Sequence, residues 1–309
     1  MDFKLLQKLI EIRGASGDES RVRDFIIDHV ARHKSSWKSE VELVFGPEVQ
    51  DSLILIFGKP KTAVYAHMDS IGFMVGYDNH LIKIGGPRTE EGYELVGSDS
   101  QGEIETELMI IEDEEGNKNL KCVSDRIIDR GTILTFKPNF REDDNYIQSP
   151  YLDNRLGVWV ALELAKTMEN GAIVFSTYEE VGGNSVGFLA QYLYKRFQLQ
   201  QNLISDITWV TDGVSHGNGV AISMRDKGIP RRTYIERIIS IAKESDVKFQ
   251  LEVESAGGSD GSLLQSSEMP MDWCFIGAPE NFVHTPNEKV HKEDIQNMIA
   301  IYQLLLSKL

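Results

Sequence analysis

The sequence has little cysteine, no long apolar run and a shortage of positive charge. Its 309 residues include two cysteines, Cys122 and Cys274, so a disulfide framework is not expected and a reducing cytoplasm is the expected compartment. No apolar stretch approaches the roughly 20 residues of a membrane-spanning helix. The first residues have the pattern of an amphipathic helix rather than of a secretory signal. We therefore expect a cytoplasmic protein with no membrane partner.

The charge balance also limits the partners. Lys and Arg number 32 against 48 Asp and Glu, which gives a net charge of −16. Such a chain is repelled by phosphate backbones, so we expect no nucleic-acid partner. An acidic surface can attract cationic ligands such as free amino termini, although solubility is the simpler use of most of these charges.

Two patterns of secondary structure alternate along the chain. Helices and apolar strands alternate in residues 1–72 and 149–309, which predicts an α/β fold with a mostly parallel or mixed sheet flanked by helices. Between residues 73 and 148, short β-like runs alternate with Gly, Asp, Asn and Glu, and no helical period appears. We interpret this stretch as a small all-β domain inserted into the α/β domain, with an acidic hairpin tip at 112–116.

One stretch joins a predicted strand to two adjacent carboxylates. The strand at 172–177 is followed by Glu179, Glu180 and a pair of glycines. Where the backbone turns at a strand end, two neighbouring acids can serve one site, one as a metal ligand and the other facing the substrate. A solvated strand end is the plainer interpretation. Earlier in the chain, Ser16 and Glu19 have the spacing of a capping box for the second helix.

Other polar residues also follow predicted strands or precede a helix. They are His67 and Asp69 after the strand at 62–67, Asp153 ahead of the helix at 156–168, Asp212 after the strand at 207–211, and His284 in a loop. Ligands of open α/β sheets bind at the carboxyl ends of strands. Histidines and carboxylates together suit Zn²⁺, Co²⁺ or Mn²⁺. Taken singly, each has another explanation, such as a helix cap, a turn residue or a hydrogen-bonded histidine.

Six short motifs then carry a resemblance. They are His67-Met-Asp-Ser-Ile-Gly-Phe-Met, Leu152-Asp-Asn-Arg-Leu-Gly157, Tyr178-Glu-Glu-Val-Gly182, Val210-Thr-Asp-Gly213, Gly257-Gly-Ser-Asp260 and His284-Thr-Pro-Asn-Glu288. Their order and spacing resemble metallopeptidase family 42, the glutamyl or deblocking aminopeptidases of the tetrahedral (TET) type, which bind two metal ions. The resemblance covers essentially the whole chain.

The resemblance implies a role for each matching residue. It implies two divalent ions per chain, Zn²⁺ or Co²⁺ most readily, held by five ligands: His67, Asp153, Glu180, Asp212 and His284. Asp153 would bridge the two ions. Glu179 matches the general base, and Asp69 would hold the second nitrogen of the His67 imidazole.

The implied activity is removal of N-terminal residues from short peptides. The implied architecture is a discontinuous catalytic domain of the zinc-peptidase type, residues 1–72 and 149–309, with the insert at 73–148 mediating dimerisation. The resemblance leaves open a dimer or a dodecamer. Two alternatives remain at this point: a metal-dependent deacylase or dipeptidase acting on N-acyl amino acids, and a non-catalytic binding protein of the same fold.

A free α-ammonium group on the substrate requires partners. Leaving such a cation unpaired in a desolvated pocket is costly. We expect Glu179 to supply part of this recognition and Asp260 to supply more, although Asp260 can equally be a turn residue bonded to its own backbone. The acidic balance favours a free amine over an acyl group.

Overall fold

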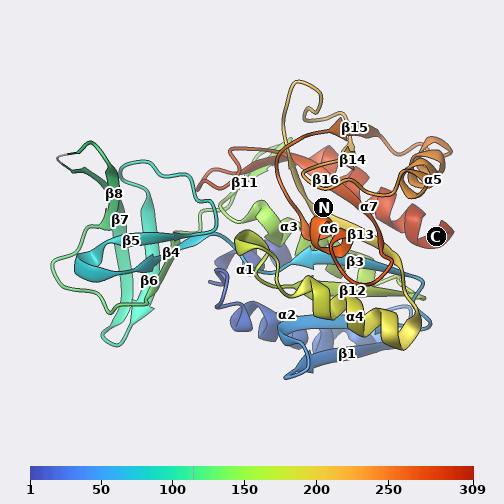
Figure 1. Cartoon of the computed structure of the whole chain (residues 1–309), viewed down its shortest axis with the longest axis horizontal. Coiled ribbons are helices and arrows are strands. Elements are labelled where there is room, and N and C mark those ends of the chain that lie inside the picture. The colour runs from blue at the N-terminus through green and yellow to red at the C-terminus, as the bar shows by residue number, and fades with distance from the viewer. Residues whose placement is uncertain (114) are drawn as a thin grey trace.

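The protein consists of a larger α/β body and a smaller sheet that projects from it (Figure 1). The computed structural model describes residues 1–113 and 115–309. Glu114, in the predicted hairpin tip, lies outside the described residues. On either side of it, strands β7 and β8 pair antiparallel, as that prediction requires.

Helices and strands alternate through the larger body. The helices are α1 (Lys4–Glu11), α2 (Ser20–His33), α3 (Leu152–Ala165), α4 (Val186–Phe197), α5 (Arg232–Lys243), α6 (Asp260–Gln265) and α7 (Lys292–Lys308), with short 3₁₀ helices η1 (Lys34–Ser36), η2 (Tyr77–Asn79) and η3 (Glu179–Val181), η2 belonging to the smaller sheet's region. The strands are β1 (Val41–Gly46), β2 (Gln50–Phe57), β3 (Thr62–His67), β10 (Arg141–Glu142), β11 (Tyr146–Gln148), β12 (Gly171–Ser176), β13 (Gln201–Trp209), β14 (Val220–Arg225), β15 (Phe249–Val253), β16 (Asp272–Asn281) and β17 (Lys289–His291).

These eleven strands form one mixed sheet, in the order β1-β2-β12-β3-β13-β16-β17-β11-β10, with β14 and β15 attached beside β16. The central strands β12, β3, β13 and β16 are parallel to their neighbours in that run. Their carboxyl ends therefore meet at one edge of the sheet, which is where ligands of such sheets bind. The predicted α/β fold with a mixed sheet is confirmed.

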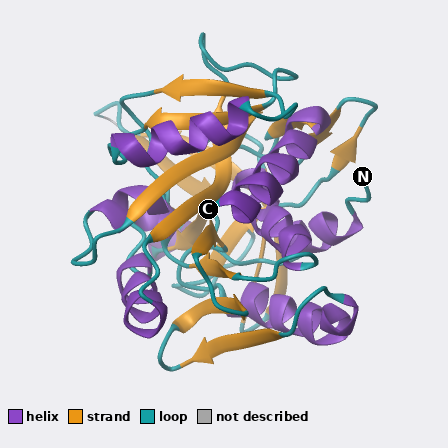
Figure 2. Ribbon diagram, turned by 90° about the vertical axis from the view of Figure 1, so that its right-hand side faces the viewer, coloured by secondary structure: helices purple, strands orange, loops and turns teal. Residues whose placement is uncertain are grey.

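Helices cover both faces of this sheet (Figure 2). Side chains alternate across a strand, so Val64 of β3 packs into one core while Tyr65 packs into the other. The first core includes residues of α1, α2, α3, α5 and α7, and the second includes residues of α4 and α6. Burial on both faces explains why the central strands are almost continuously apolar. Among the described residues, no helix is long and apolar enough to cross a lipid bilayer.

The smaller sheet is antiparallel and contains six strands: β4 (Gly72–Val75), β5 (Leu81–Ile84), β6 (Glu94–Asp99), β7 (Gly102–Glu112), β8 (Lys118–Cys122) and β9 (Ile133–Phe136), in the order β5-β4-β9-β6-β7-β8. We expected the inserted unit to run to residue 148. However, β10 and β11 lie in the larger sheet, where β11 pairs with β17, so the last strand of the smaller sheet ends at Phe136. That the smaller sheet is a domain of its own stays a prediction.

Candidate active site

The carboxyl edge of the central strands brings together most of the residues that we singled out. Six of them line one cavity of about 730 Å³: His67, Asp153, Glu179, Glu180, Asp206 and His284. His67 ends β3, Asp153 lies in the first turn of α3, and Glu179 and Glu180 form the turn that follows β12. His284 lies between β16 and β17. Residues more than 200 positions apart in the sequence thus share one site.

Two groups of three side chains in this cavity have donor atoms close enough to share an ion. The first group is His67, Asp153 and Asp206, and the second is Asp153, Glu180 and His284; within each, the donor atoms lie within 4.8 Å of one another. Asp153 belongs to both. Its Oδ1 lies 3.2 Å from His67 Nε2, and its Oδ2 lies 3.3 Å from His284 Nε2. Each oxygen of this carboxylate therefore faces a different group.

The remaining distances complete the two groups. Asp206 Oδ2 lies 3.6 Å from His67 Nε2, and Glu180 Oε2 lies 3.3 Å from His284 Nε2. Asp153 itself follows Leu152 at the start of α3, where its backbone is not yet helical and its peptide bond to Asn154 is cis. The start of α3 thus serves to present a carboxylate as well as to begin a helix.

The prediction for Asp212 needs correction. Asp212 lies beyond the end of β13, exposed to solvent, and is not part of either group. We placed the strand at 207–211, but β13 runs from Gln201 to Trp209, so the carboxylate that reaches the site is Asp206 inside the strand. Asp is disfavoured in strand interiors and is almost never fully buried without a partner. The predicted strand was therefore started after Asp206 rather than through it.

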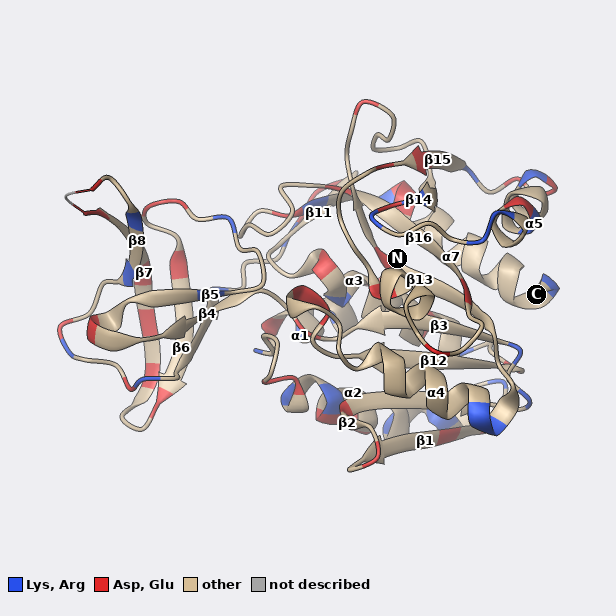
Figure 3. Ribbon diagram, viewed as in Figure 1, with Lys and Arg blue, Asp and Glu red and all other residues tan. Residues whose placement is uncertain are grey.

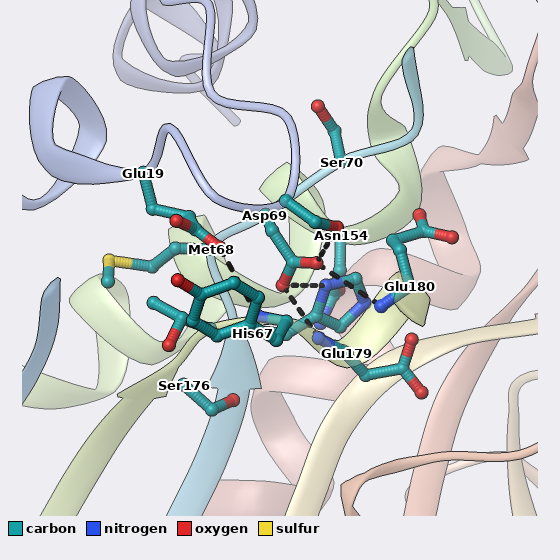
Figure 4. A network of polar contacts seen from close by, with 12 residues as sticks. Glu19, His67, Met68, Asp69, Ser70, Asn154, Ser176, Glu179 and Glu180 are labelled. Atoms are coloured by element: carbon teal, nitrogen blue, oxygen red, sulfur yellow. Dashed lines mark hydrogen bonds and ion pairs between the residues drawn. The ribbon is translucent and has the colours of Figure 1, made fainter. Parts of the chain in front are cut away.

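Asp69 is the centre of a buried hydrogen-bond network (Figure 4). Its Oδ1 lies 3.4 Å from His67 Nδ1 and accepts the Glu179 backbone N–H at 3.1 Å. Its Oδ2 accepts the Glu180 backbone N–H at 3.2 Å. Figure 4 shows the side chains of Glu179 and Glu180 pointing away from Asp69. One carboxylate thus sets the orientation of the histidine and of the turn that carries both glutamates.

The expected capping box at the start of α2 is replaced by contacts to this network. Ser16 Oγ donates to Asp69 Oδ2 at 2.6 Å, and Glu19 Oε1 accepts the backbone N–H of Tyr178 at 3.2 Å. Neither side chain caps α2. The pair has the spacing of a helix cap, but both residues instead support the strand ends that hold the site.

Sequence reasoning gave no role to Glu288. This fully buried carboxylate accepts the backbone N–H of Asp153 through Oε2 at 3.1 Å and that of His284 through Oε1 at 3.0 Å. It therefore fixes the backbones of two residues from different cavity-lining segments. Its place four residues after His284, at the end of a quoted motif, was the only signal in the sequence.

The turn after β12 has a shape that a side chain would obstruct. Tyr178 adopts the left-handed conformation with φ of 65°, and η3 follows directly. Gly183 also has a positive φ, of 62°, and a Cβ built there would lie 1.9 Å from Leu263 of α6. A glycine at this position lets the turn carrying Glu179 and Glu180 approach α6 closely.

The loop that follows β5 reaches the same site from the smaller sheet. His284 Nδ1 donates to the backbone carbonyl of Gly86 at 3.1 Å, which leaves Nε2 facing Asp153 and Glu180. The backbone N–H of Arg88 in turn donates to the His284 carbonyl at 2.9 Å. The inserted segment thus sets the tautomer of a candidate ligand.

Burial and like charge dominate the electrostatics. Burial by itself lowers the pKa of the His67 imidazole, but Asp206, Asp153 and Asp69 outweigh it and hold the pKa well above its usual value. Burial raises the pKa of Glu179 well above its ordinary value. The same holds for Glu180, whose pKa the Asp153 carboxylate raises further. The protein has thus gathered more negative charge than its histidines can neutralise.

These residues fit divalent cations. Two histidines and three carboxylates form two donor sets of the mixed nitrogen and oxygen type that Zn²⁺, Co²⁺ and Mn²⁺ prefer. Glu180 Oε1 is buried without a hydrogen-bond partner among the described residues, although buried polar atoms are normally satisfied. A cation at each group would compensate both the excess charge and this orphaned oxygen.

Comparisons with known proteins agree with this site. The chain is 25% identical to the lysyl aminopeptidase of Pyrococcus furiosus, over 100% of this chain and 98% of that one. An aminopeptidase from the archaeon Desulfurococcus kamchatkensis superposes with a TM-score of 0.85 at 22% identity, covering 99% of this chain and 94% of that one. The TET1 peptidase of Pyrococcus horikoshii, which can assemble into a tetrahedron or a large octahedral shell, superposes at 0.79 with 21% identity, covering 98% of each chain.

A family model settles the relationship that the motifs suggested. The model of the M42 glutamyl aminopeptidases matches residues 96–301, which is about two thirds of the chain. This range includes five of the six cavity-lining residues named above, all but His67. The chain therefore belongs to the M42 glutamyl aminopeptidase family.

Proposed function

We propose that this protein is a dinuclear metallo-aminopeptidase that releases N-terminal residues from short peptides. The observation that carries the proposal is the shared carboxylate of Asp153, whose two oxygens face two separate donor groups in one cavity. Family membership supports the peptidase activity. We assign one ion to His67, Asp153 and Asp206, and the other to Asp153, Glu180 and His284.

Two divalent ions held there would supply Lewis acidity, which lowers the pKa of a water and offsets negative charge on the carbonyl oxygen under attack. Glu179 lines the same cavity and belongs to neither donor group, so it remains available as a base. Its carboxylate accepts the proton of the attacking water and returns it to the leaving amine. Asp69 positions Glu179 through its backbone N–H.

The substrate's α-ammonium group would be paired by the acidic side chains of this cavity rather than by Asp260. Asp260 is fully buried, hydrogen-bonds the Ser176 hydroxyl and does not line the cavity. Burial raises its pKa to about 7, which weakens it further as a partner for a cation. Glu179 faces the cavity directly and is the better partner.

The test combines metal analysis with matched substrates. Protein reconstituted with Zn²⁺ or Co²⁺ should hold two ions per chain, lose activity on chelation, and cleave leucine amide or short peptides while leaving their N-acetylated forms intact. Hydrolysis of N-acetyl amino acids without hydrolysis of the unblocked peptides would establish the deacylase alternative instead. Two bound ions with no hydrolysis of either class would favour a non-catalytic binding protein.

We also propose that the smaller sheet mediates self-association. Three neighbouring strands carry a row of apolar side chains, Ile82 of β5, Met74 of β4 and Ile133 of β9, which are cross-strand partners on one face. Ile82 is 63% exposed and Met74 39% exposed. Exposed apolar patches of this kind commonly mark protein interfaces. The assembly of the TET1 peptidase supports a homo-oligomer, either a dimer or a larger particle.

A further inference from the structure

The cavity extends well beyond the two donor groups. Past the ends of β13, β14 and β15 its wall includes three carboxylates, those of Asp226, Glu252 and Glu254. None of them was singled out in the sequence, and none belongs to a donor group. Asp226 is 7% exposed and Glu252 is 3% exposed, so two of the three are buried in the wall.

These carboxylates have hydrogen-bond donors but no cation. Asp226 accepts the Gly228 N–H at 2.5 Å and the Ser259 hydroxyl at 3.0 Å, and Glu252 accepts the Thr208 hydroxyl. In the described part of the chain, none of the three forms an ion pair with Lys, Arg or His. Buried acidic residues are rarely left without a positive partner, because the uncompensated charge is costly.

The neighbouring basic residues do not fill this role. Arg225 donates from Nε to the Asp226 backbone carbonyl rather than to its carboxylate. Lys227 lines the cavity but is exposed, and it faces three acidic groups. Burial raises the pKa of Glu252, and the carboxylates of Glu254 and Asp226 raise it further, so the three acids lie close enough to repel one another. An incoming cation would relieve that repulsion.

We infer that this end of the cavity, the acidic end formed by Asp226, Glu252 and Glu254, selects peptides whose N-terminal residue has a cationic side chain, lysine or arginine. The inference rests on the proposed function and goes beyond it by naming the substrate class. It also opposes the preference that the family's name suggests, because a glutamyl side chain would meet three like charges.

The position of the acidic end suits such a side chain. Glu252 is held by Thr208, and Thr208 lies two residues after Asp206 on the same face of β13. Two residues of a strand span about 7 Å, comparable to the reach of a lysine side chain. Apolar wall residues, Leu263 and Phe275 among them, can pack against its methylene groups while the ammonium group meets the carboxylates.

The experiment compares substrates that differ only in the distal charge. Lysyl and norleucyl p-nitroanilides have side chains of similar length, and both present an α-ammonium group. We expect the wild-type kcat/KM to be at least about tenfold higher for the lysyl substrate, the scale of one buried charge pair, and to be lowest for the glutamyl substrate. All assays use one low ionic strength, because salt screens the effect.

Variants then locate the selectivity. Glu252→Gln keeps the size of the side chain and an acceptor for Thr208, and should reduce the lysyl-to-norleucyl ratio by about tenfold. Glu244→Gln, an exposed residue outside the cavity, removes the same charge and should leave the ratio unchanged. A wild-type ratio near one, a preference for the glutamyl substrate, or an equal loss of ratio in both variants would overturn the inference.

A binding measurement separates this inference from the proposed function. Titration calorimetry of lysinamide and norleucinamide into Zn²⁺-loaded Glu179→Gln protein reports on the pocket without turnover. Tighter binding of lysinamide, lost on adding Glu252→Gln, supports the acidic end even if the wild-type protein hydrolyses nothing. Equal binding of the two amides overturns the acidic end even if the wild-type protein hydrolyses both substrates.

Discussion

The two ends of the cavity use the same kind of residue under different conditions. At the donor-group end, the buried carboxylates of Asp153, Asp206 and Glu180 lie within 3.6 Å of a histidine nitrogen. At the acidic end, Asp226 and Glu252 are equally buried but have only hydroxyl and amide donors. Histidine converts a buried acid cluster into a set of metal ligands, whereas its absence leaves a negative pocket.

The difference indicates how each end is neutralised. The donor-group end requires compensation at all times, because its charge is fixed by the fold and supported by Asp69 and Glu288. The acidic end requires compensation only when a substrate is bound. A site that awaits its cation is well suited to selecting one. The predictions below test this contrast, beginning with the largest expected effect.

The first concerns the base at the donor-group end. Glu179→Gln should retain both ions and reduce kcat by about 10²–10⁴-fold for every substrate, because the amide keeps the shape but cannot accept a proton. Glu252→Gln should instead change the ratio between substrates. Metal analysis and steady-state kinetics on both variants distinguish these outcomes. Near-normal turnover in Glu179→Gln would assign the base elsewhere.

The second tests which aspartate of the β13 region is a ligand. Asp206→Asn should lower the metal content from two ions to about one and greatly reduce activity, since it weakens the group that includes His67. Asp212→Asn is the matched control, because Asp212 is exposed and outside both groups. Metal analysis after dialysis measures the difference. Loss of an ion in Asp212→Asn but not in Asp206→Asn would restore the assignment made from the sequence.

The third prediction concerns support rather than ligation. Glu288→Gln should weaken metal binding by about 10–100-fold, because one of its two backbone N–H acceptors becomes a donor. A competition titration with a chelator gives the affinity, and added metal should restore most of the activity. If added metal restores none, Glu288 acts by some route other than positioning Asp153 and His284.

Part of the site follows from the sequence because strand ends are legible there. Apolar runs that stop at His67 or before Glu179 predict that these residues meet at one edge of a parallel sheet. Asp206 was missed because it interrupts an apolar strand, and a buried acid is understandable only when the opposing histidine is known. The local pattern therefore favoured a strand end at Asp212.

Long-range partners are not written in local periodicity. Ser16 and Glu288 lie far from the residues that they support, and their spacing indicated a helix cap in one case and nothing in the other. Glu252 alternates with exposed residues in β15, as any acid on a solvated strand would. Its burial depends on α6, β13 and β14 closing the cavity around it, which no single segment specifies.

The last prediction tests the smaller sheet and should have the least effect on chemistry. Ile82→Lys places a charge in the exposed apolar row formed with Met74, and should shift the protein toward smaller species in light scattering at micromolar concentration. Phe45→Lys is the matched control, since Phe45 is 53% exposed on the larger body. Hydrolysis per chain should change little, because the cavity residues belong mainly to the larger body and only Gly86 reaches it from the smaller sheet's loops in the described chain. If the wild-type protein is already a monomer, or if Phe45→Lys dissociates it and Ile82→Lys does not, the smaller sheet is not the interface. If Ile82→Lys dissociates the protein and also removes activity, then the Gly86–His284 contact depends on assembly, and the two sheets are coupled through that hydrogen bond.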